Sequence, residues 1–173
     1  MNLKGKIYLA GPEVFLPDAT TYFEHAKKIC SFYGYEGISP FDGEPIQETG
    51  LHKADLIFQN NCGLIESVQF VIANCNAFRG ALVDDGTAFE IGYAFGLRKK
   101  IFGFLDHISP LLENIADRIE TSEHDSGYRM DKQGYLVNED FGNCINLMLE
   151  MAIQKSGGRL VEGTLETVLA LLP

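Results

Sequence analysis

The chain has 173 residues, of which 46% are hydrophobic, and its formal net charge is −10. This length and composition predict a single domain over residues 1–173 with a real core. The acidic balance argues against partners such as nucleic acid or an anionic membrane surface, and no apolar run reaches the ~20 residues of a membrane helix. The start of the chain lacks a signal-peptide pattern, so we expect a cytoplasmic protein with its four cysteines reduced.

Apolar runs bounded by turn residues alternate along the chain with segments of helical periodicity. We expect strands at 6–10, 36–39, 69–74, 101–105 and 159–161. We expect helices at 18–33, 52–66, 143–154 and 164–172, together with one that carries Glu90 and ends near Leu97. The segment 106–139 is polar and contains several glycines, and it receives no assignment.

Strands that alternate with helices predict βαβ units and a parallel sheet covered on both faces. We therefore expect an α/β, flavodoxin-like, doubly wound sheet of about five strands in the order 2-1-3-4-5. Ligands bind such sheets beyond the carboxyl ends of the strands, where the strand order reverses. The loop at Gly11 and the loop leading to Glu90 should converge there. Dinucleotide and P-loop motifs are missing and the cysteines lack metal-ligand spacing, so we expect neither cofactor nor metal.

Glu90 has two interpretations when its segment is taken alone. Thr87 and Glu90 have the Thr-x-x-Glu spacing of a capping box, in which both side chains bind free amides of the first helical turn. However, Asp84 and Asp85 already offer cap oxygens, and the helix after Glu90 is unusually apolar and small, as expected behind a pocket. Glu90 is therefore either a cap or a chemically active carboxylate.

Four motifs occur in the order and spacing of one known family, and together they cover about residues 6 to 150. They are Tyr8-Leu9-Ala10-Gly11-Pro12-Glu13-Val14-Phe15, Phe78-Arg79-Gly80, Asp84 through Ala94, and Phe141-Gly142 with Ile145-Asn146-Leu147-Met148-Leu149. In these motifs the chain resembles the nucleoside 2-deoxyribosyltransferases. Asn61 also falls where such proteins often place an Asn.

The resemblance implies transfer of 2-deoxyribose between nucleobases through a covalent intermediate on a Glu, the two-displacement logic of retaining glycosidases. The implied partners are a small-molecule deoxynucleoside and a free nucleobase. The implied roles are Glu90 as nucleophile, Tyr8 as the residue that orients it, Asp84 on the sugar hydroxyls, Phe15 and Gly11 in the substrate-binding first loop, and Asn146 reaching a sugar hydroxyl in a neighbouring subunit.

Each role has a structural alternative. Tyr8 and Phe15 could be core residues, Asp84 a helix cap, and Asn146 a polar residue in a helix turn. If Asn146 has its family role, the active protein is a homo-oligomer, a dimer or higher.

The chain departs from the family at the start of the third strand, where members commonly carry an Asp that contacts the base and helps to protonate it. The matching residue is Gln69, and an amide can hydrogen-bond a base but supplies no proton at neutral pH. We therefore expect slow turnover, bases that leave without much protonation, or a replacement acid such as Glu13, Asp42 or Glu66. Two alternatives to transfer also stay open: hydrolysis with water as acceptor, and a non-catalytic nucleoside-binding module.

Overall fold

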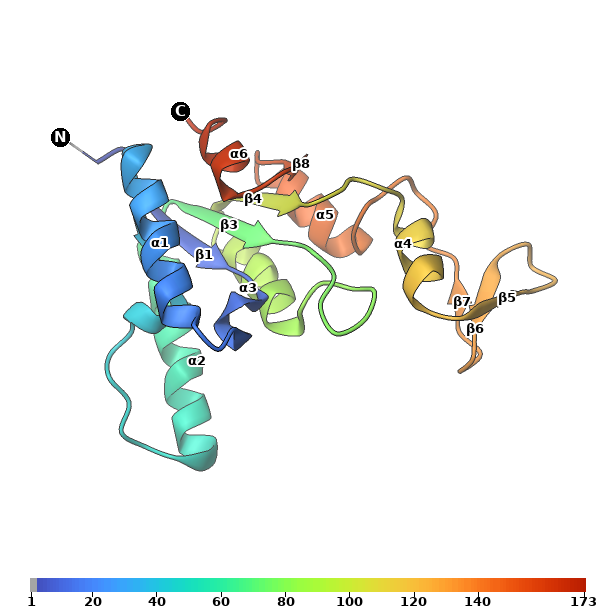
Figure 1. Ribbon diagram of the computed structural model, residues 1–173, viewed down its shortest axis with the longest axis horizontal. Helices are drawn as coiled ribbons and strands as arrows, with labels where there is room; N and C mark the ends of the chain where they lie inside the picture. The colour runs from blue at the N-terminus through green and yellow to red at the C-terminus, as the bar shows by residue number, and fades with distance from the viewer. Residues whose placement is uncertain (1–2) are drawn as a thin grey trace.

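The computed structural model describes residues 3–173, which form an α/β fold around a five-stranded parallel sheet (Figure 1). The strands of this sheet are β1 (Lys6–Ala10), β2 (Glu36–Ile38), β3 (Phe70–Asn74), β4 (Lys100–Leu105) and β8 (Leu160–Glu162). Their spatial order is β2-β1-β3-β4-β8, and every neighbouring pair is parallel. Because β8 is the fifth strand of this sheet along the chain, the predicted order 2-1-3-4-5 is confirmed.

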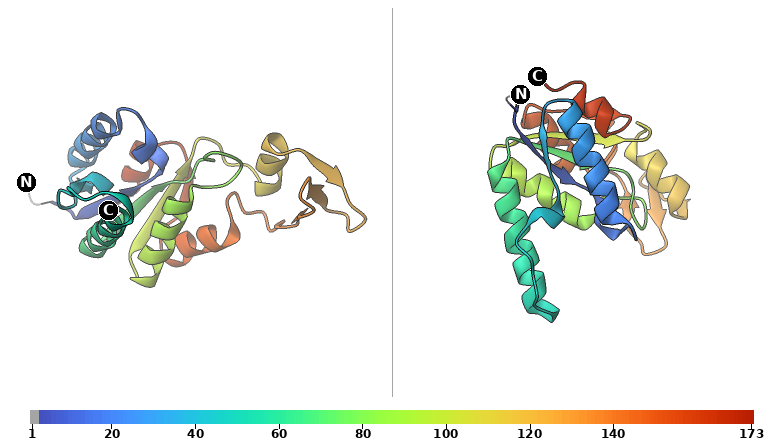
Figure 2. Two further views of the ribbon diagram at one scale, coloured as in Figure 1. Left: turned by 90° about the horizontal axis from the view of Figure 1, so that it is seen from below. Right: turned by 60° about the vertical axis from the view of Figure 1, so that its left-hand side comes forward.

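Helices cover both faces of the sheet, as the two further views in Figure 2 show. Helices α2, α3 and α5 contribute to the apolar core on one face, and α1 and α6 to the core on the other. The helices are α1 (Ala19–Phe32), α2 (Gly50–Ser67), α3 (Asp85–Gly96), α5 (Leu147–Lys155) and α6 (Leu165–Leu169), with short 3₁₀ turns η1 (Pro12–Phe15) and η2 (Pro40–Asp42). None of the helices in residues 3–173 is both long and apolar enough to cross a membrane.

The first strand divides its side chains between the two cores because successive residues of a strand point to opposite faces. Ile7 and Leu9 pack on the side of α1, whereas Tyr8 and Ala10 pack on the side of α3. All four are buried. The alternation places the Tyr8 phenol beneath α3, the helix that carries Glu90.

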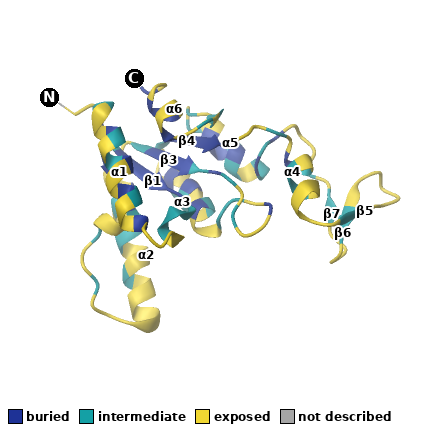
Figure 3. Ribbon diagram, in the orientation of Figure 1, coloured by how far each residue is buried: buried dark blue, intermediate teal, exposed yellow. Residues whose placement is uncertain are grey.

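The segment without a sequence assignment projects from the body of the molecule as an arm of residues 106–139 (Figure 1). It contains α4 (Leu111–Arg118) and an antiparallel sheet of β5 (Thr121–Glu123), β6 (Arg129–Asp131) and β7 (Leu136–Val137). Most of the arm is exposed in Figure 3, and of its described residues only Leu111 is buried. Strands of two or three residues are too short to show a periodicity in sequence.

Helix α5 begins at Leu147, whereas the sequence predicted a start near Asn143. Gly142 has a φ of 76°, a left-handed conformation that breaks a right-handed helix. The side chains of two acids bind the backbone between Gly142 and the helix: Glu150 accepts the Cys144 N–H at 2.7 Å, and Glu139 accepts the Leu147 N–H. The loop of residues 139–146 is therefore a hydrogen-bonded structure in place of the predicted helical turn.

Candidate active site

Tyr8 and Glu90 form a hydrogen-bonded pair beneath the switch point of the sheet. The Tyr8 hydroxyl donates to Glu90 Oε1 at 2.6 Å, so the predicted contact between strand β1 and helix α3 is present. Tyr8 has no exposed surface, and Glu90 is half-buried. The bond occupies Oε1 and leaves Oε2 available to a ligand.

The environment of Glu90 favours its neutral form. Burial raises the pKa of Glu90 to about 7, the Tyr8 hydrogen bond opposes that rise, and the negative charge of Asp84 adds to it. Burial also raises the pKa of Tyr8, with the Glu90 charge as a second cause. The phenol therefore keeps its proton and acts as a hydrogen-bond donor. A carboxylate with a strongly raised pKa beside a specific partner is a marker of functional sites.

The first turn of α3 is capped by Asp84, so the alternative of a capping box between Thr87 and Glu90 does not occur. Asp84 Oδ2 accepts from the Thr87 N–H at 3.0 Å and from the Thr87 hydroxyl at 3.2 Å. Both contacts use Oδ2, so Oδ1 can accept from a ligand. Because Asp84 supplies the cap, Glu90, five residues after the first helical residue, is not needed for that role.

A cavity of about 750 Å³ opens beside α2, and its walls are mainly apolar. Phe15, Phe41 and Ile57 line it, together with Asn61. The buried Oδ1 of Asn61 has no hydrogen-bond partner among residues 3–173. The next residue, Cys62, is close enough for the Glu90 charge to raise its pKa, after the larger effect of burial. Neither Tyr8 nor Glu90 is among the residues that line the cavity, so Cys62, next to Asn61 in α2, is the residue that relates the two places.

The loops that follow β1 and β3 meet over this region, as predicted from the strand order. The Phe15 and Phe78 rings stack with centroids 5.2 Å apart, and the Arg79 guanidinium lies 4.7 Å from each ring centroid. Gly11 has a local reason to lack a side chain, because a Cβ there would lie 2.0 Å from Glu13 Oε2. Phe15 thus lines the cavity, whereas a contact of Gly11 with substrate stays a prediction.

Gln69 lies elsewhere, and this corrects its predicted place in the site. Its Oε1 accepts from the Lys6 backbone N–H at 2.8 Å, at the amino-terminal edge of the sheet. That edge is opposite the loops that carry Phe15 and Asp84. The cavity is lined by polar residues that include Asn61, whose buried Oδ1 has no partner in residues 3–173. The signal for Asn61 in the sequence was its match to the family pattern in the helix before β3.

The three acids considered as replacement proton donors are each engaged by other groups. Glu13 accepts from the Tyr22 hydroxyl at 3.0 Å and from Asn74 Nδ2 at 2.6 Å. Asp42 forms an ion pair with Lys27 and accepts the Ser39 N–H, and Glu66 accepts from the Tyr93 hydroxyl at 2.5 Å. The geometry therefore favours none of the three as the acid.

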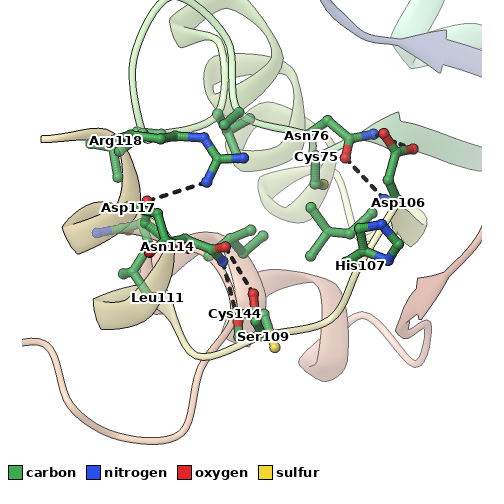
Figure 4. Close-up of a pocket in the computed structure, with 17 residues that line it drawn as sticks. Cys75, Asn76, Asp106, His107, Ser109, Leu111, Asn114, Asp117, Arg118 and Cys144 are labelled. Atoms are coloured by element: carbon green, nitrogen blue, oxygen red, sulfur yellow. Dashed lines mark hydrogen bonds between the residues drawn. The ribbon is translucent and has the colours of Figure 1, made fainter.

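Asn146 is the N-cap of α5 and faces a different cavity, of about 310 Å³. This second cavity lies at the carboxyl ends of β3 and β4, and Figure 4 shows Asn76, Asp106, His107 and Arg118 around it. Glu90 and Tyr8 are not among the residues that line it. Within one protomer, Glu90 therefore does not share the cavity that Asn146 faces.

The fold and the half-buried Glu90 carboxylate define an α/β protein with a nucleophile candidate at the switch point of its sheet. Residues 7–148 match the family model described as nucleoside 2-deoxyribosyltransferase, and the chain belongs to that family.

Three similar proteins illustrate the relationship. A 2-desoxiribosyltransferase from Leishmania mexicana is 30% identical with a TM-score of 0.71, over 96% of this chain and 95% of that one. An uncharacterized protein from Schizosaccharomyces pombe is 32% identical over 88% of this chain and 78% of its own length. A conserved protein from Enterococcus faecalis, 16% identical with a TM-score of 0.59 over 95% of this chain and 94% of its own, shares the fold.

Proposed function

We propose that the protein is a nucleoside 2-deoxyribosyltransferase that moves 2-deoxyribose between nucleobases through a covalent intermediate on Glu90. The observation that carries this proposal is the hydrogen bond from the Tyr8 hydroxyl to Glu90 Oε1, which holds a half-buried carboxylate with its second oxygen free. A positioned carboxylate can attack an anomeric carbon, and its charge also stabilises the positive charge that develops there.

In the proposed first step, Glu90 Oε2 forms a bond to C1′ while the bond from C1′ to the base nitrogen breaks. The base leaves with that electron pair and takes its proton from solvent. In the second step, a nitrogen of another base attacks C1′ from the side that the first base left and releases its proton to solvent, while the ester bond breaks and its electron pair returns to the Glu90 carboxylate. The two inversions retain the configuration at C1′.

We assign the nucleobase to the cavity beside α2, whose aromatic and aliphatic walls suit a flat ring. Phe15 and Phe41 would contact the ring, and the Asn61 amide would form the polar contact that its oxygen lacks in the unliganded protein. An amide contributes no proton, and general acid catalysis is worth about 10²–10⁴-fold. We therefore expect slow turnover and a preference for bases that leave without much protonation.

We further propose that Asp84 Oδ1 accepts from a sugar hydroxyl and that Asn146 reaches the sugar from a second protomer. Exposed apolar side chains support such an assembly, because Phe141 and Met148 flank Asn146 and are 73% and 70% exposed. A row of aromatic rings, Phe58, Phe89 and Tyr93, extends over α2 and α3 beside Glu90 with centroid spacings of 5.5 and 5.8 Å. A two-fold axis would pair these two surfaces twice.

The four free cysteines fit a reducing compartment such as the cytoplasm.

The decisive experiment is chromatography of the products formed from deoxyinosine or thymidine, with and without free adenine. Deoxyadenosine that appears only with adenine, and is lost in Glu90→Gln, supports the transferase. Glu36→Gln is a matched control, since that carboxylate pairs with Lys6 away from the site. Free base and deoxyribose without regard to adenine would indicate a hydrolase. Ligand-dependent thermal stabilisation without turnover would indicate a nucleoside-binding module.

A further inference from the structure

A single carboxylate, that of Glu139, organises the loop that presents Asn146. Its Oε1 accepts from Asn143 Nδ2 at 2.8 Å and from the Leu147 backbone N–H. Its Oε2 accepts from Asn146 Nδ2 at 3.0 Å. Glu139 therefore places a negative charge at the amino end of α5, where the helix dipole favours it, and also binds the side chain of the residue that caps the helix.

The amide of Asn146 has one permitted orientation in this loop. Its Oδ1 must face the Met148 N–H, which donates to it at 3.1 Å, and its Nδ2 must face the Glu139 carboxylate. Rotating the amide by 180° would set an N–H against an N–H and an oxygen against a carboxylate. One N–H of Nδ2 is committed to Glu139, so the second N–H is the one left for another partner.

The arm of residues 106–139 gains a role from this arrangement, because it ends at Glu139. The first residue of its helix, Leu111, also donates its backbone N–H to the Asn143 carbonyl at 2.8 Å. The arm thus holds the Asn146 loop at two points, once through the Glu139 carboxylate and once through α4.

We propose that Glu139 is a positioning residue for the transfer reaction. It orients Asn146 so that the free N–H of the amide donates to a sugar hydroxyl oxygen bound in the site of a second copy of this chain. Glu139 itself does not touch the substrate. This inference rests on the proposed function and on the contribution of Asn146 to a neighbouring site.

The first test is a double-mutant cycle on Glu139→Gln and Asn146→Ala, with kcat and KM measured for a 2-deoxynucleoside and for analogues that lack the 3′- or the 5′-hydroxyl. Each single change should lower kcat/KM by roughly tenfold, the value of one hydrogen bond. Glu139→Gln should have no further effect when Asn146 is already Ala. Both losses should vanish for the analogue that lacks the contacted hydroxyl. Equal losses on all three substrates, or additive losses, would overturn the proposal.

The second test exchanges the two functional groups, in the variant Glu139→Gln/Asn146→Asp. Gln at 139 can donate to Asp at 146 and still accept from Leu147 and Asn143, so the loop regains its hydrogen bonds at unchanged net charge. The free N–H that the Asn146 amide would donate to the sugar, however, is absent from this variant. We expect this double variant to have the melting temperature of the wild type but a low kcat/KM. Recovery of both would mean that Glu139 only stabilises the loop and would refute the positioning role.

Glu123→Gln, a change at an exposed position on the same arm, is the control and should match the wild type. Wild-type protein that turns over no deoxynucleoside would refute the proposed function and this inference with it. Active wild-type protein whose rate is insensitive to Glu139→Gln would refute the inference alone.

Discussion

The hydrogen bond from Tyr8 to Glu90 should set the pH at which the protein works. The nucleophile must be a carboxylate, and the pKa of Glu90 is about 7, held down by the Tyr8 hydroxyl against the effect of burial. Tyr8→Phe removes that hydroxyl and keeps the ring in the core. A hydrogen bond to a charged group is worth about 1.5–3 kcal/mol, which corresponds to a pKa rise of about 1–2.

The direction of the change in kcat/KM follows from the fact that the ionised form of Glu90 loses the Tyr8 hydroxyl as its hydrogen-bond donor. Tyr8→Phe destabilises the carboxylate, so less of it is present at any pH near neutrality. At pH 7 the ionised fraction should fall from about one half to about one tenth or one hundredth, and kcat/KM should fall by about fivefold to fiftyfold. By pH 9.5 most of the loss should be recovered.

The assay is a pH profile of kcat/KM between pH 5.5 and 9.5 for the wild type and Tyr8→Phe, with a deoxynucleoside that is stable across that range. The acidic limb of the wild type should have its midpoint near pH 7, and that of the variant should be more alkaline. A variant with an unchanged midpoint and a uniform loss at every pH would refute the reasoning, because Tyr8 would then act on geometry alone.

Three further predictions concern stability, assembly and the leaving base. The pKa of Glu90 rises from 4.5 to about 7 on folding, so ionisation of the carboxylate opposes folding progressively between about pH 4.5 and pH 7. Glu90→Gln should therefore be more stable than the wild type by up to about 3 kcal/mol at pH 8, by about 1 kcal/mol near pH 5, and by nothing below about pH 4. Equal unfolding midpoints in denaturant at pH 8 would contradict this. Mixing inactive Glu90→Gln protein with Asn146→Ala protein should restore about a quarter of the wild-type activity, since each dimer of one variant with the other rebuilds one intact site. No gain in activity would place Asn146 in its own protomer's site. Asn61→Asp should speed base release in single-turnover experiments at acidic pH, where the new carboxyl can donate a proton, and an unchanged rate would exclude Asn61 from the base contact.

The sheet and its strand order could be predicted because short apolar runs and intervening helices allow few topologies. The contact between Tyr8 and Glu90 came from family motifs, since no local pattern pairs residues that lie 82 positions apart. The sequence left two caps open for this helix, and spacing alone does not reveal that the Asp84 oxygen is the one that reaches the Thr87 amide.

Two other differences have physical causes that sequence does not display. The start of α5 was misplaced because Glu139 and Glu150 bind backbone amides of the loop before it, and such contacts depend on the return path of the arm. Gln69 was assigned to the base because its position in the chain resembles that of a family acid. The fold places it at the amino-terminal edge of the sheet, whereas Asn61 lies at the cavity.

The cap of α3 makes the backbone amide of Thr87 sensitive to ligand binding. Asp84 Oδ2 protects the Thr87 amide, and Oδ1 of the same carboxylate is the oxygen that we propose to bind a sugar hydroxyl. A sugar hydroxyl that binds Oδ1 restrains the carboxylate, so the first turn of α3 should open less often. Amide hydrogen exchange at Thr87 would then slow as ligand is added, which makes one backbone proton a probe of binding in protein that has not turned over.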